Sequence, residues 1–314
     1  MKEQNVNPGK NKVLFQSDGK KLAAFLFVPS DYKEGEKRPA VVITRPASGV
    51  KEQTAGLYAQ KFSEKGFVAI TFDPKGYGES EGKPQVEDPF SIISDTLNAV
   101  TFVESLPQVD KDNIFNAGVC MGAGYATAAS TQDKRIKGTA AISPYLTIHI
   151  DYPKAYGGKS VVRIMMAFFK SFSFLLGLVG LDAYLPLVPI KSWMRLIPAI
   201  PVQHGMMLYY APGTPGDVPN WKNKINLAKT DNFILRYNPF DFTSRFRDKP
   251  FFMAYADGGY STDLLQKFYN DISVDDKELF VAKNATHFDL YYKPEFIDPI
   301  VEKVTAFFKK HINA

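Results

Sequence analysis

Cysteine is nearly absent from this chain, since Cys120 is the only one among 314 residues. A single cysteine excludes an intramolecular disulfide and any zinc site built from several cysteines. An excess of one charge sign is lacking too, because 38 basic residues are interspersed with 33 acidic ones for a net charge of +5. The chain shows no basic patch of the kind that binds nucleic acid. We therefore expect no nucleic-acid partner.

Long apolar runs are also missing. The polar start, residues 1–5, has no apolar segment behind it, so no secretory signal peptide is evident. The apolar stretch 168–190 contains a charge-free interval between Lys170 and Asp182 that is too short for a spanning helix. No metal or cofactor motif is present, and no P-loop lysine. These absences predict a cytoplasmic protein without a cofactor, without a metal and without stable membrane insertion; whether it forms a homodimer is left open.

What the chain does contain is a regular alternation of strand-like and helix-like segments at both of its ends. With 45% hydrophobic residues, it can bury a large core. The alternation predicts an α/β protein with a mostly parallel, doubly wound sheet covered on both faces. Asp18-Gly19 is a strong turn signal between the first two strands, which should therefore form an antiparallel hairpin at the sheet edge. The expected strands lie near 13–15, 22–28, 39–44, 67–72, 113–117, 137–143, 251–255 and 278–281, and the helices near 51–65, 92–103, 123–129, 262–271 and 294–311.

Residues 145–247 interrupt this alternation. The segment has many prolines, a middle rich in methionine and aromatic residues, and no sheet periodicity. Because it begins and ends inside one sheet pattern, an insertion after the sixth strand is favoured over a separate domain. We expect a core made of residues 1–144 and 248–314, and a largely helical cap made of residues 145–247.

Cys120 lies in the pentapeptide Gly118-Val119-Cys120-Met121-Gly122, between a strand-like run and a small-residue helix. A G-x-C-x-G sequence at such a junction has the spacing of a nucleophile elbow, a sharp turn that raises one reactive side chain above a sheet. Glycines are needed two residues to either side, because a Cβ at those positions would meet neighbouring backbone. Taken alone, an isolated cysteine is more often a small buried hydrophobe.

The order of the other reactive residues favours catalysis. Asp257 follows one predicted strand and His287 follows the last one. Catalytic groups of open α/β sheets lie at the carboxyl ends of strands, and the chain order nucleophile, acid, histidine is that of a hydrolase triad. We predict Cys120, Asp257 and His287 as nucleophile, acid and base. Asp263 and Asp289 are the rivals of Asp257 for orienting the imidazole.

These roles define a mechanism. His287 would accept the proton of Cys120 and form a thiolate–imidazolium pair, and the N-terminus of the following helix would lower the thiol pKa further. An oxyanion formed on a substrate carbonyl needs preorganised donors. The backbone N–H groups of Met121 and Ala47 are the expected donors. Arg45, at the end of the strand before Ala47, either binds an anionic substrate group or is solvated.

These motifs resemble the α/β-hydrolase superfamily. The cysteine-centred elbow is similar to that of dienelactone hydrolases, which use a Cys-Asp-His triad. The wider pattern resembles bacterial α/β hydrolases classed with polyketide-transferase-type proteins. The resemblance implies an α/β-hydrolase fold over about two-thirds of the chain, and the cap matches poorly. The segments that carry the wider resemblance are Phe15-Gln16-Ser17-Asp18-Gly19, Gly49-Val50-Lys51-Glu52-Gln53, Phe72-Asp73-Pro74-Lys75-Gly76-Tyr77-Gly78-Glu79-Ser80 and Ala285-Thr286-His287-Phe288-Asp289-Leu290-Tyr291.

The cap suggests the kind of substrate. Its apolar middle must cover the nucleophile, and ligand pockets are mostly apolar. We expect Phe168, Phe172 and Trp193 to bind substrate, with ordinary packing as the alternative. The leading hypothesis is a hydrolase of an ester, thioester or lactone with a lipophilic or aromatic acyl group as its small-molecule partner. The alternatives are an acyltransferase with the same triad and a non-catalytic protein that binds a small apolar ligand.

Overall fold

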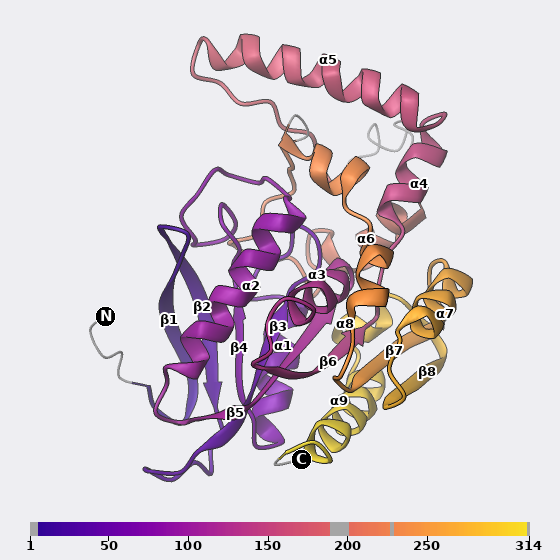
Figure 1. The fold of residues 1–314 in the computed structure, drawn as a ribbon. Coiled ribbons are helices and arrows are strands. Elements are labelled where there is room, and N and C mark those ends of the chain that lie inside the picture. Colours follow the sequence, from indigo (N-terminus) through magenta and orange to yellow (C-terminus); the bar gives the residue numbers. More distant parts are fainter. Residues whose placement is uncertain (1–5, 189–200, 227–228, 313–314) are drawn as a thin grey trace.

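The sheet forms the centre of the molecule (Figure 1). In a computed structural model that describes residues 6–188, 201–226 and 229–312, eight strands pair in the order β1-β2-β4-β3-β5-β6-β7-β8. β2 is antiparallel to both β1 and β4, and the other pairs are parallel. The predicted mostly parallel sheet with an antiparallel hairpin at its edge is confirmed. The strands are β1 (Gly9–Ser17), β2 (Lys20–Val28), β3 (Arg38–Thr44), β4 (Val68–Phe72), β5 (Val109–Val119), β6 (Ile136–Ile142), β7 (Phe251–Gly258) and β8 (Lys277–Thr286).

Helices bury both faces of this sheet. Along β3, Ala40 and Val42 belong to one buried cluster while Val41 and Ile43 belong to another, because successive side chains of a strand point to opposite faces. A central strand with two buried faces is apolar without alternation. The helices of the core are α1 (Thr54–Glu64), α2 (Pro89–Glu104), α3 (Met121–Ser130), α7 (Thr262–Asp271), α8 (Asp289–Tyr292) and α9 (Pro294–Lys309).

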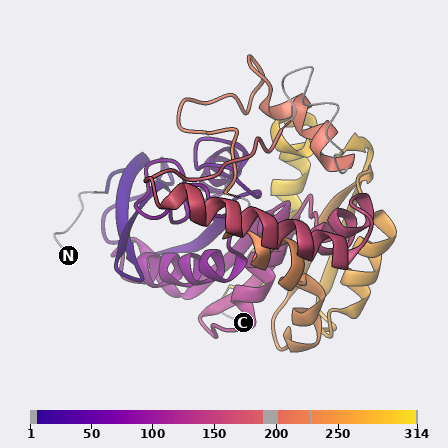
Figure 2. The ribbon, with the colours of Figure 1, turned by 90° about the horizontal axis from the view of Figure 1, so that it is seen from above.

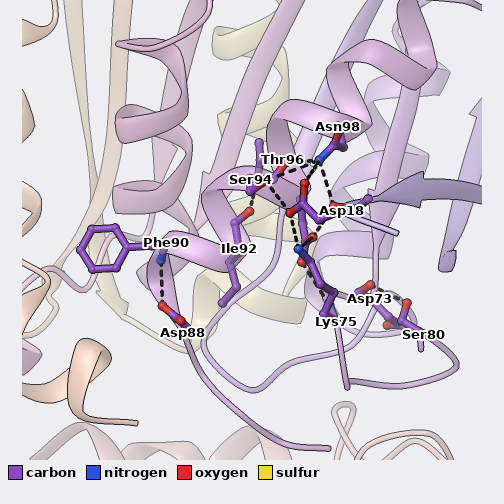
Figure 3. Close-up of polar contacts among 12 residues, drawn as sticks. Asp18, Asp73, Lys75, Ser80, Asp88, Phe90, Ile92, Ser94, Thr96 and Asn98 are labelled. Atoms are coloured by element: carbon purple, nitrogen blue, oxygen red, sulfur yellow. Dashed lines mark hydrogen bonds and ion pairs between the residues drawn. The ribbon is translucent and has the colours of Figure 1, made fainter. Parts of the chain in front are cut away.

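The hairpin between β1 and β2 is fastened to the rest of the core through its turn. Asp18 and Gly19 both have positive φ, 46° and 76°, which is the backbone of the turn that matches strand twist. The Asp18 carboxylate accepts hydrogen bonds from Lys75 in the loop after β4 and from Ser94 and Asn98 on α2 (Figure 3). A turn required by local geometry thereby also fixes the sheet edge against α2.

The segment between β6 and β7 adds no strand to the sheet in its described part. It contains α4 (Ile148–Ala155), α5 (Lys159–Gly177), α6 (Pro201–Tyr210), the π-helix η3 (Asn232–Arg236) and the 3₁₀ helix η4 (Pro239–Arg245). α5 lies farthest from the sheet in Figure 1 and crosses over the molecule in Figure 2. Among the described helices it alone has the length and composition of a membrane span, and 11% of its apolar window is buried.

The turn between β5 and α3 has the geometry that the glycine spacing predicts. Cys120 has φ 58° and ψ −123°, in a region that residues with a side chain rarely adopt. A Cβ on Gly118 would lie 2.0 Å from the carbonyl oxygen of Gly122. A Cβ on Gly122 would lie 2.3 Å from the carbonyl oxygen of Thr44 in β3. The two glycines therefore allow three backbone segments to meet directly below Cys120.

This contact gives a test of the turn. We expect Gly122→Ala to lower the free energy of unfolding by about 1–3 kcal/mol, because the new methyl group must displace the backbone of β3. The measurement is urea unfolding followed by circular dichroism. Gly177→Ala is the control, because a Cβ at this position in α5 meets nothing within 4 Å; it should be neutral or stabilising. Equal stability of the two variants would contradict the close approach.

Candidate active site

The thiol of Cys120 is enclosed by hydrogen-bond donors at the carboxyl edge of the sheet. The residue is 7% exposed. Its sulfur receives the backbone N–H groups of Met121, the first residue of α3, and of Ala47, in the loop after β3. Its third hydrogen-bond partner is the hydroxyl of Tyr291 on α8. Both N–H groups that the sequence suggested as oxyanion donors therefore point at the reactive atom.

Tyr291 connects this thiol to His287. The Tyr291 hydroxyl lies 3.2 Å from Nε2 of His287, and the two rings are 5.3 Å apart. On the other side of the imidazole, Nδ1 lies 3.1 Å from the hydroxyl of Ser143, the residue that follows β6. Cys120, Tyr291, His287 and Ser143 thus form one buried chain of polar side chains.

The backbone of His287 sets the direction of these hydrogen bonds. The Ser143 hydroxyl donates its single hydrogen to the carbonyl oxygen of His287 at 2.9 Å. Nδ1 must then be the donor to the Ser143 oxygen, which leaves Nε2 with a free lone pair. Nε2 accepts from Tyr291, and the Tyr291 oxygen can in turn accept from the thiol. A proton can therefore pass from Cys120 to Nε2 through one hydroxyl.

Burial keeps this chain neutral at rest. It raises the pKa of the Cys120 thiol to about 11, although Tyr291 and the two N–H groups lower it. Burial also lowers the pKa of His287 to about 3. At pH 7, roughly one thiol in ten thousand is then ionised. The expectation of a thiolate–imidazolium pair with a depressed thiol pKa is wrong for the resting protein, because desolvation outweighs the helix terminus.

Asp257 is not placed against His287, although it lies at the end of β7 as expected. Its exposed carboxylate accepts a hydrogen bond of 3.4 Å from the N–H of Ala285 and lies 4.0 Å from Nζ of Lys283. Ser143 occupies the position at Nδ1 that the acid was expected to fill. The rival Asp289 is bound to Thr286 and Lys293 instead, and Asp263 is exposed. Among the described residues, no carboxylate hydrogen-bonds to His287.

Arg45 has a different role from the two suggested by the sequence. Its side chain is fully buried, and its Nη1 lies 2.8 Å from Oε1 of Glu87. The other oxygen of Glu87 accepts the N–H of Ser48 at 2.9 Å, and Tyr125 donates to Oε1 at 3.1 Å. The anion that meets Arg45 is thus a carboxylate of this chain rather than a substrate group. The buried pair holds the loop that carries Ala47.

In the described part of residues 145–247, α6 packs against the segment that carries His287 and Tyr291. Gly205 of α6 packs so closely that an added Cβ would lie 2.7 Å from the ring of Phe288. Tyr209 lies 5.1 Å from the Tyr291 ring, and Tyr210 stacks at 4.9 Å on Trp221. Phe168 and Phe172 on α5, expected to bind substrate, are 67% and 47% exposed. Trp193, the third expected substrate residue, lies outside the described residues.

Tyr291, Ser143 and Glu87 are the site residues that sequence reasoning missed. A signal for Tyr291 was present, because it follows His287 by four residues and such spacing places two side chains on one face of a helix. Ser143 is the last residue of an expected strand, and a strand pattern by itself gives no reason to pair it with His287. Nothing in the sequence pairs Glu87 with Arg45, since 42 residues separate them.

One cluster of carboxylates has the spacing of a metal site. Ligand atoms of Glu52, Asp73 and Glu79 lie within 4.8 Å of one another. Nζ of Lys51 lies 2.8, 2.7 and 2.6 Å from these three carboxylates. The lysine ammonium therefore already occupies the position of a cation.

Comparison with known proteins shows the fold and a family similarity over part of the chain. The model of the dienelactone hydrolase family matches residues 22–167. The crystal structure of hypothetical protein PA2218 from Pseudomonas aeruginosa superposes with a TM-score of 0.81 at 26% identity, covering 96% of this chain and 93% of that one. The α/β hydrolase GrgF from Penicillium sp. sh18 superposes with a TM-score of 0.80 at 22% identity, covering 97% of this chain and 99% of that one. The chain therefore has an α/β-hydrolase-like fold, and over residues 22–167 it is similar to the dienelactone hydrolase family. The predicted α/β-hydrolase fold is confirmed.

Particular relatives differ in how much of the chain they match. YcjY of Escherichia coli K12 is 28% identical over 96% of this chain and 98% of its own length. Thiohydrolase aneE of Aspergillus aculeatus is 35% identical over 41% of this chain, and polyketide transferase claH of Penicillium crustosum is 34% identical over 46%. These two matches span 39% and 48% of the relatives' own lengths.

The buried neutral imidazole predicts how stability changes with pH. The unfolded His287 titrates near its ordinary pKa of about 6.5, whereas the folded residue titrates at about 3. Below pH 6.5 the unfolded state binds more protons, so stability is lost as the pH falls. Between pH 7 and pH 5, the free energy of unfolding of the wild-type protein should fall by about 2 kcal/mol more than that of His287→Gln. Urea unfolding across this pH range measures the difference. If the free energies of unfolding of the two proteins changed with pH by the same amount, the imidazole would not be buried as a neutral ring.

Proposed function

We propose that this protein is an acyl hydrolase that cleaves an ester, thioester or lactone through a thioester on Cys120. The observation that carries the proposal is the arrangement at the sulfur: one backbone donor from the start of α3, one from the loop after β3, and a hydroxyl that leads to an imidazole. The family match to dienelactone hydrolases and the similarity to a thiohydrolase support the same reaction class.

The neutral resting site supports proton transfer during attack rather than before it. As Sγ of Cys120 bonds to the carbonyl carbon, its proton passes to the oxygen of Tyr291, and the Tyr291 proton passes to Nε2 of His287. Negative charge moves onto the carbonyl oxygen, which the N–H groups of Met121 and Ala47 then bind. Loss of one such donor in comparable enzymes lowers kcat by about 10²–10³.

The second half of the reaction runs in the opposite direction. The tetrahedral intermediate collapses to a thioester, and the departing oxygen or sulfur takes a proton back from Nε2. A water molecule then attacks the thioester as its proton moves to Nε2, and the acid leaves as Cys120 recovers its proton. In this scheme the Ser143 oxygen accepts a hydrogen bond from Nδ1–H throughout the reaction. This bond holds the ring in position, which is the role that a carboxylate has in a triad.

The aromatic lining of the site supports a lipophilic or aromatic acyl group. The rings of Tyr145 and Tyr260 lie 6.4 and 5.6 Å from the imidazole, and Phe288 lies 5.0 Å from it. A shell of this kind favours flat or apolar groups over small polar ones. An acyltransferase is the second candidate, supported by the similarity to a polyketide transferase; it would pass the same acyl group to an alcohol, amine or thiol.

The acyl-enzyme provides the direct test. Wild-type protein mixed with p-nitrophenyl acetate, octanoate or benzoate should gain one acyl mass on the peptide that contains Cys120, with octanoate and benzoate reacting faster than acetate. Cys120→Ala should lose the adduct, and kcat/KM should fall by at least roughly 10³. The measurement is quenched-flow mass spectrometry together with initial rates, repeated with an added alcohol or amine acceptor.

Three outcomes separate the alternatives. An adduct that is released faster with the added acceptor than with water would favour the acyltransferase. Ligand binding without adduct or turnover would identify a non-catalytic binding protein. A Cys120→Ala variant with the wild-type rate would refute the nucleophile.

The position of Tyr291 gives a second test. Tyr291→Phe removes only the hydroxyl that joins Cys120 to His287, so kcat/KM should fall by roughly 10²–10⁴. Tyr292→Phe, which removes the neighbouring hydroxyl on α8, is the matched control. Its kcat/KM should stay within a factor of about two of the wild-type value. Initial rates with the best ester measure both variants. An unchanged or higher rate in Tyr291→Phe would mean that the hydroxyl only covers the thiol and that the imidazole reaches it directly.

A further inference from the structure

Helix α5 leaves an apolar surface uncovered on the outside of the cap. We define the α5 stripe as the side chains that follow one another at spacings of three and four residues along α5 and its C-terminal turn: Val161, Ile164, Phe168, Phe172, Leu175 and Val179. Each of them is between 47% and 72% exposed. The opposite side of the helix holds it in place, since Val162 and Met166 are buried in the main core cluster. Monomeric proteins rarely expose an apolar surface of this extent without a partner.

The charged residues of α5 and of the segment just before it are all basic. Between Asp151 and Asp182 the sequence contains no acidic residue, but it contains Lys154, Lys159, Arg163 and Lys170. A groove of about 370 Å³ between α5 and η3 is lined by Arg163, Lys170 and Arg236, with Asp231 as its single carboxylate. Asp231 lies 3.1 Å from Lys170 and 3.7 Å from Arg236. Three cations against one anion leave the groove with a net charge of +2.

We propose that the α5 stripe and this groove dock the protein on a membrane surface that contains anionic lipid. A helix with an apolar face on one side and basic residues on the other suits the boundary between headgroups and acyl chains, where an interfacial helix is buried by roughly 5–10 Å. Lipid phosphates would then bind the cations of the groove. The proposal goes beyond the acyl hydrolase function and does not depend on it.

The surroundings of α5 favour docking on a membrane surface over two alternatives, a contact with a second copy of the chain and a membrane-spanning orientation. A second copy of the chain would present the same basic helix across a twofold axis, so it would offer the cations of α5 no anionic partner. A membrane-spanning orientation is disfavoured because both ends of α5 return to the same folded body. Before α5, Pro153 of α4 is buried, and after it Leu185 pairs with Ile225.

The position of α5 gives docking a consequence for the site. The cap begins directly after β6, whose last residues lead into Ser143 beside His287. α5 lies beyond this edge of the sheet and farthest from it (Figure 1). A protein that rests on α5 would therefore turn its cap toward the lipid, in which lipophilic acyl compounds dissolve.

Vesicle flotation tests the proposal with the full-length protein. Vesicles of phosphatidylcholine with about 30% phosphatidylglycerol should bind the protein at least fivefold more tightly than vesicles of phosphatidylcholine alone. About 0.5 M salt should remove most of this difference. Arg163→Gln combined with Arg236→Gln should weaken binding to the anionic vesicles by about fivefold for each charge removed.

The apolar stripe is tested separately. Ile164→Gln combined with Phe168→Gln should weaken binding to the anionic vesicles by tenfold or more, since both side chains would lie among the acyl chains. Leu208→Gln is the matched control, because Leu208 is 59% exposed but lies on α6; it should bind within a factor of about two of the wild type. Thermal unfolding of each variant shows whether it is folded.

Two results would overturn the proposal. One is a wild-type protein that stays with the soluble fraction at every lipid composition. The other is a wild-type dimer in sedimentation equilibrium that Ile164→Gln/Phe168→Gln converts to a monomer without any change in vesicle binding. Ester hydrolysis by the same variants in solution reports on the acyl hydrolase function independently, since neither the stripe nor the groove touches Cys120.

Discussion

The site depends on one backbone constraint, the left-handed conformation of Cys120 between β5 and α3. This conformation turns the chain sharply enough that the thiol stands above the sheet edge while the next N–H, that of Met121, points back at it. The turn is possible only because Gly118 and Gly122 have no side chains where the backbone of β3 approaches. The same approach brings the loop that carries Ala47 against the sulfur, so a single contact between strands places both N–H groups.

Burial then determines the state of the reactive groups. The thiol and the imidazole are both almost completely enclosed, and in such surroundings an uncompensated charge costs more than a hydrogen-bonded neutral group. The chain Cys120–Tyr291–His287–Ser143 satisfies its members without any charge. The nearby carboxylate of Glu87 is compensated by Arg45 and serves the loop rather than the imidazole. In the mechanism that we propose, this neutral chain passes the thiol proton to the imidazole only as the sulfur bonds to a carbonyl carbon.

The cap has two faces with separate roles in the structure. α6 points inward, and its Tyr209, Tyr210 and closely packed Gly205 cover the loop of His287. α5 carries the stripe, whose apolar side chains are between 47% and 72% exposed. Residues 145–247 thus contain both a helix packed closely on the His287 loop and a helix with an exposed apolar surface, which we propose to bind lipid.

The sequence by itself determined the layered fold, because apolar runs without alternation can only be strands buried on both faces, and the turn at Asp18-Gly19 marks an edge hairpin. It also determined the strained turn at Cys120, since glycine spacing is a local property, and it placed His287 after the last strand. Only the tertiary structure decided which groups meet there. Ser143 rather than Asp257 contacts the imidazole, Arg45 meets Glu87, and α6 packs against the segment that carries His287 and Tyr291. Such pairings depend on how segments distant in the chain pack together, and packing also sets the desolvation that keeps Cys120 and His287 neutral.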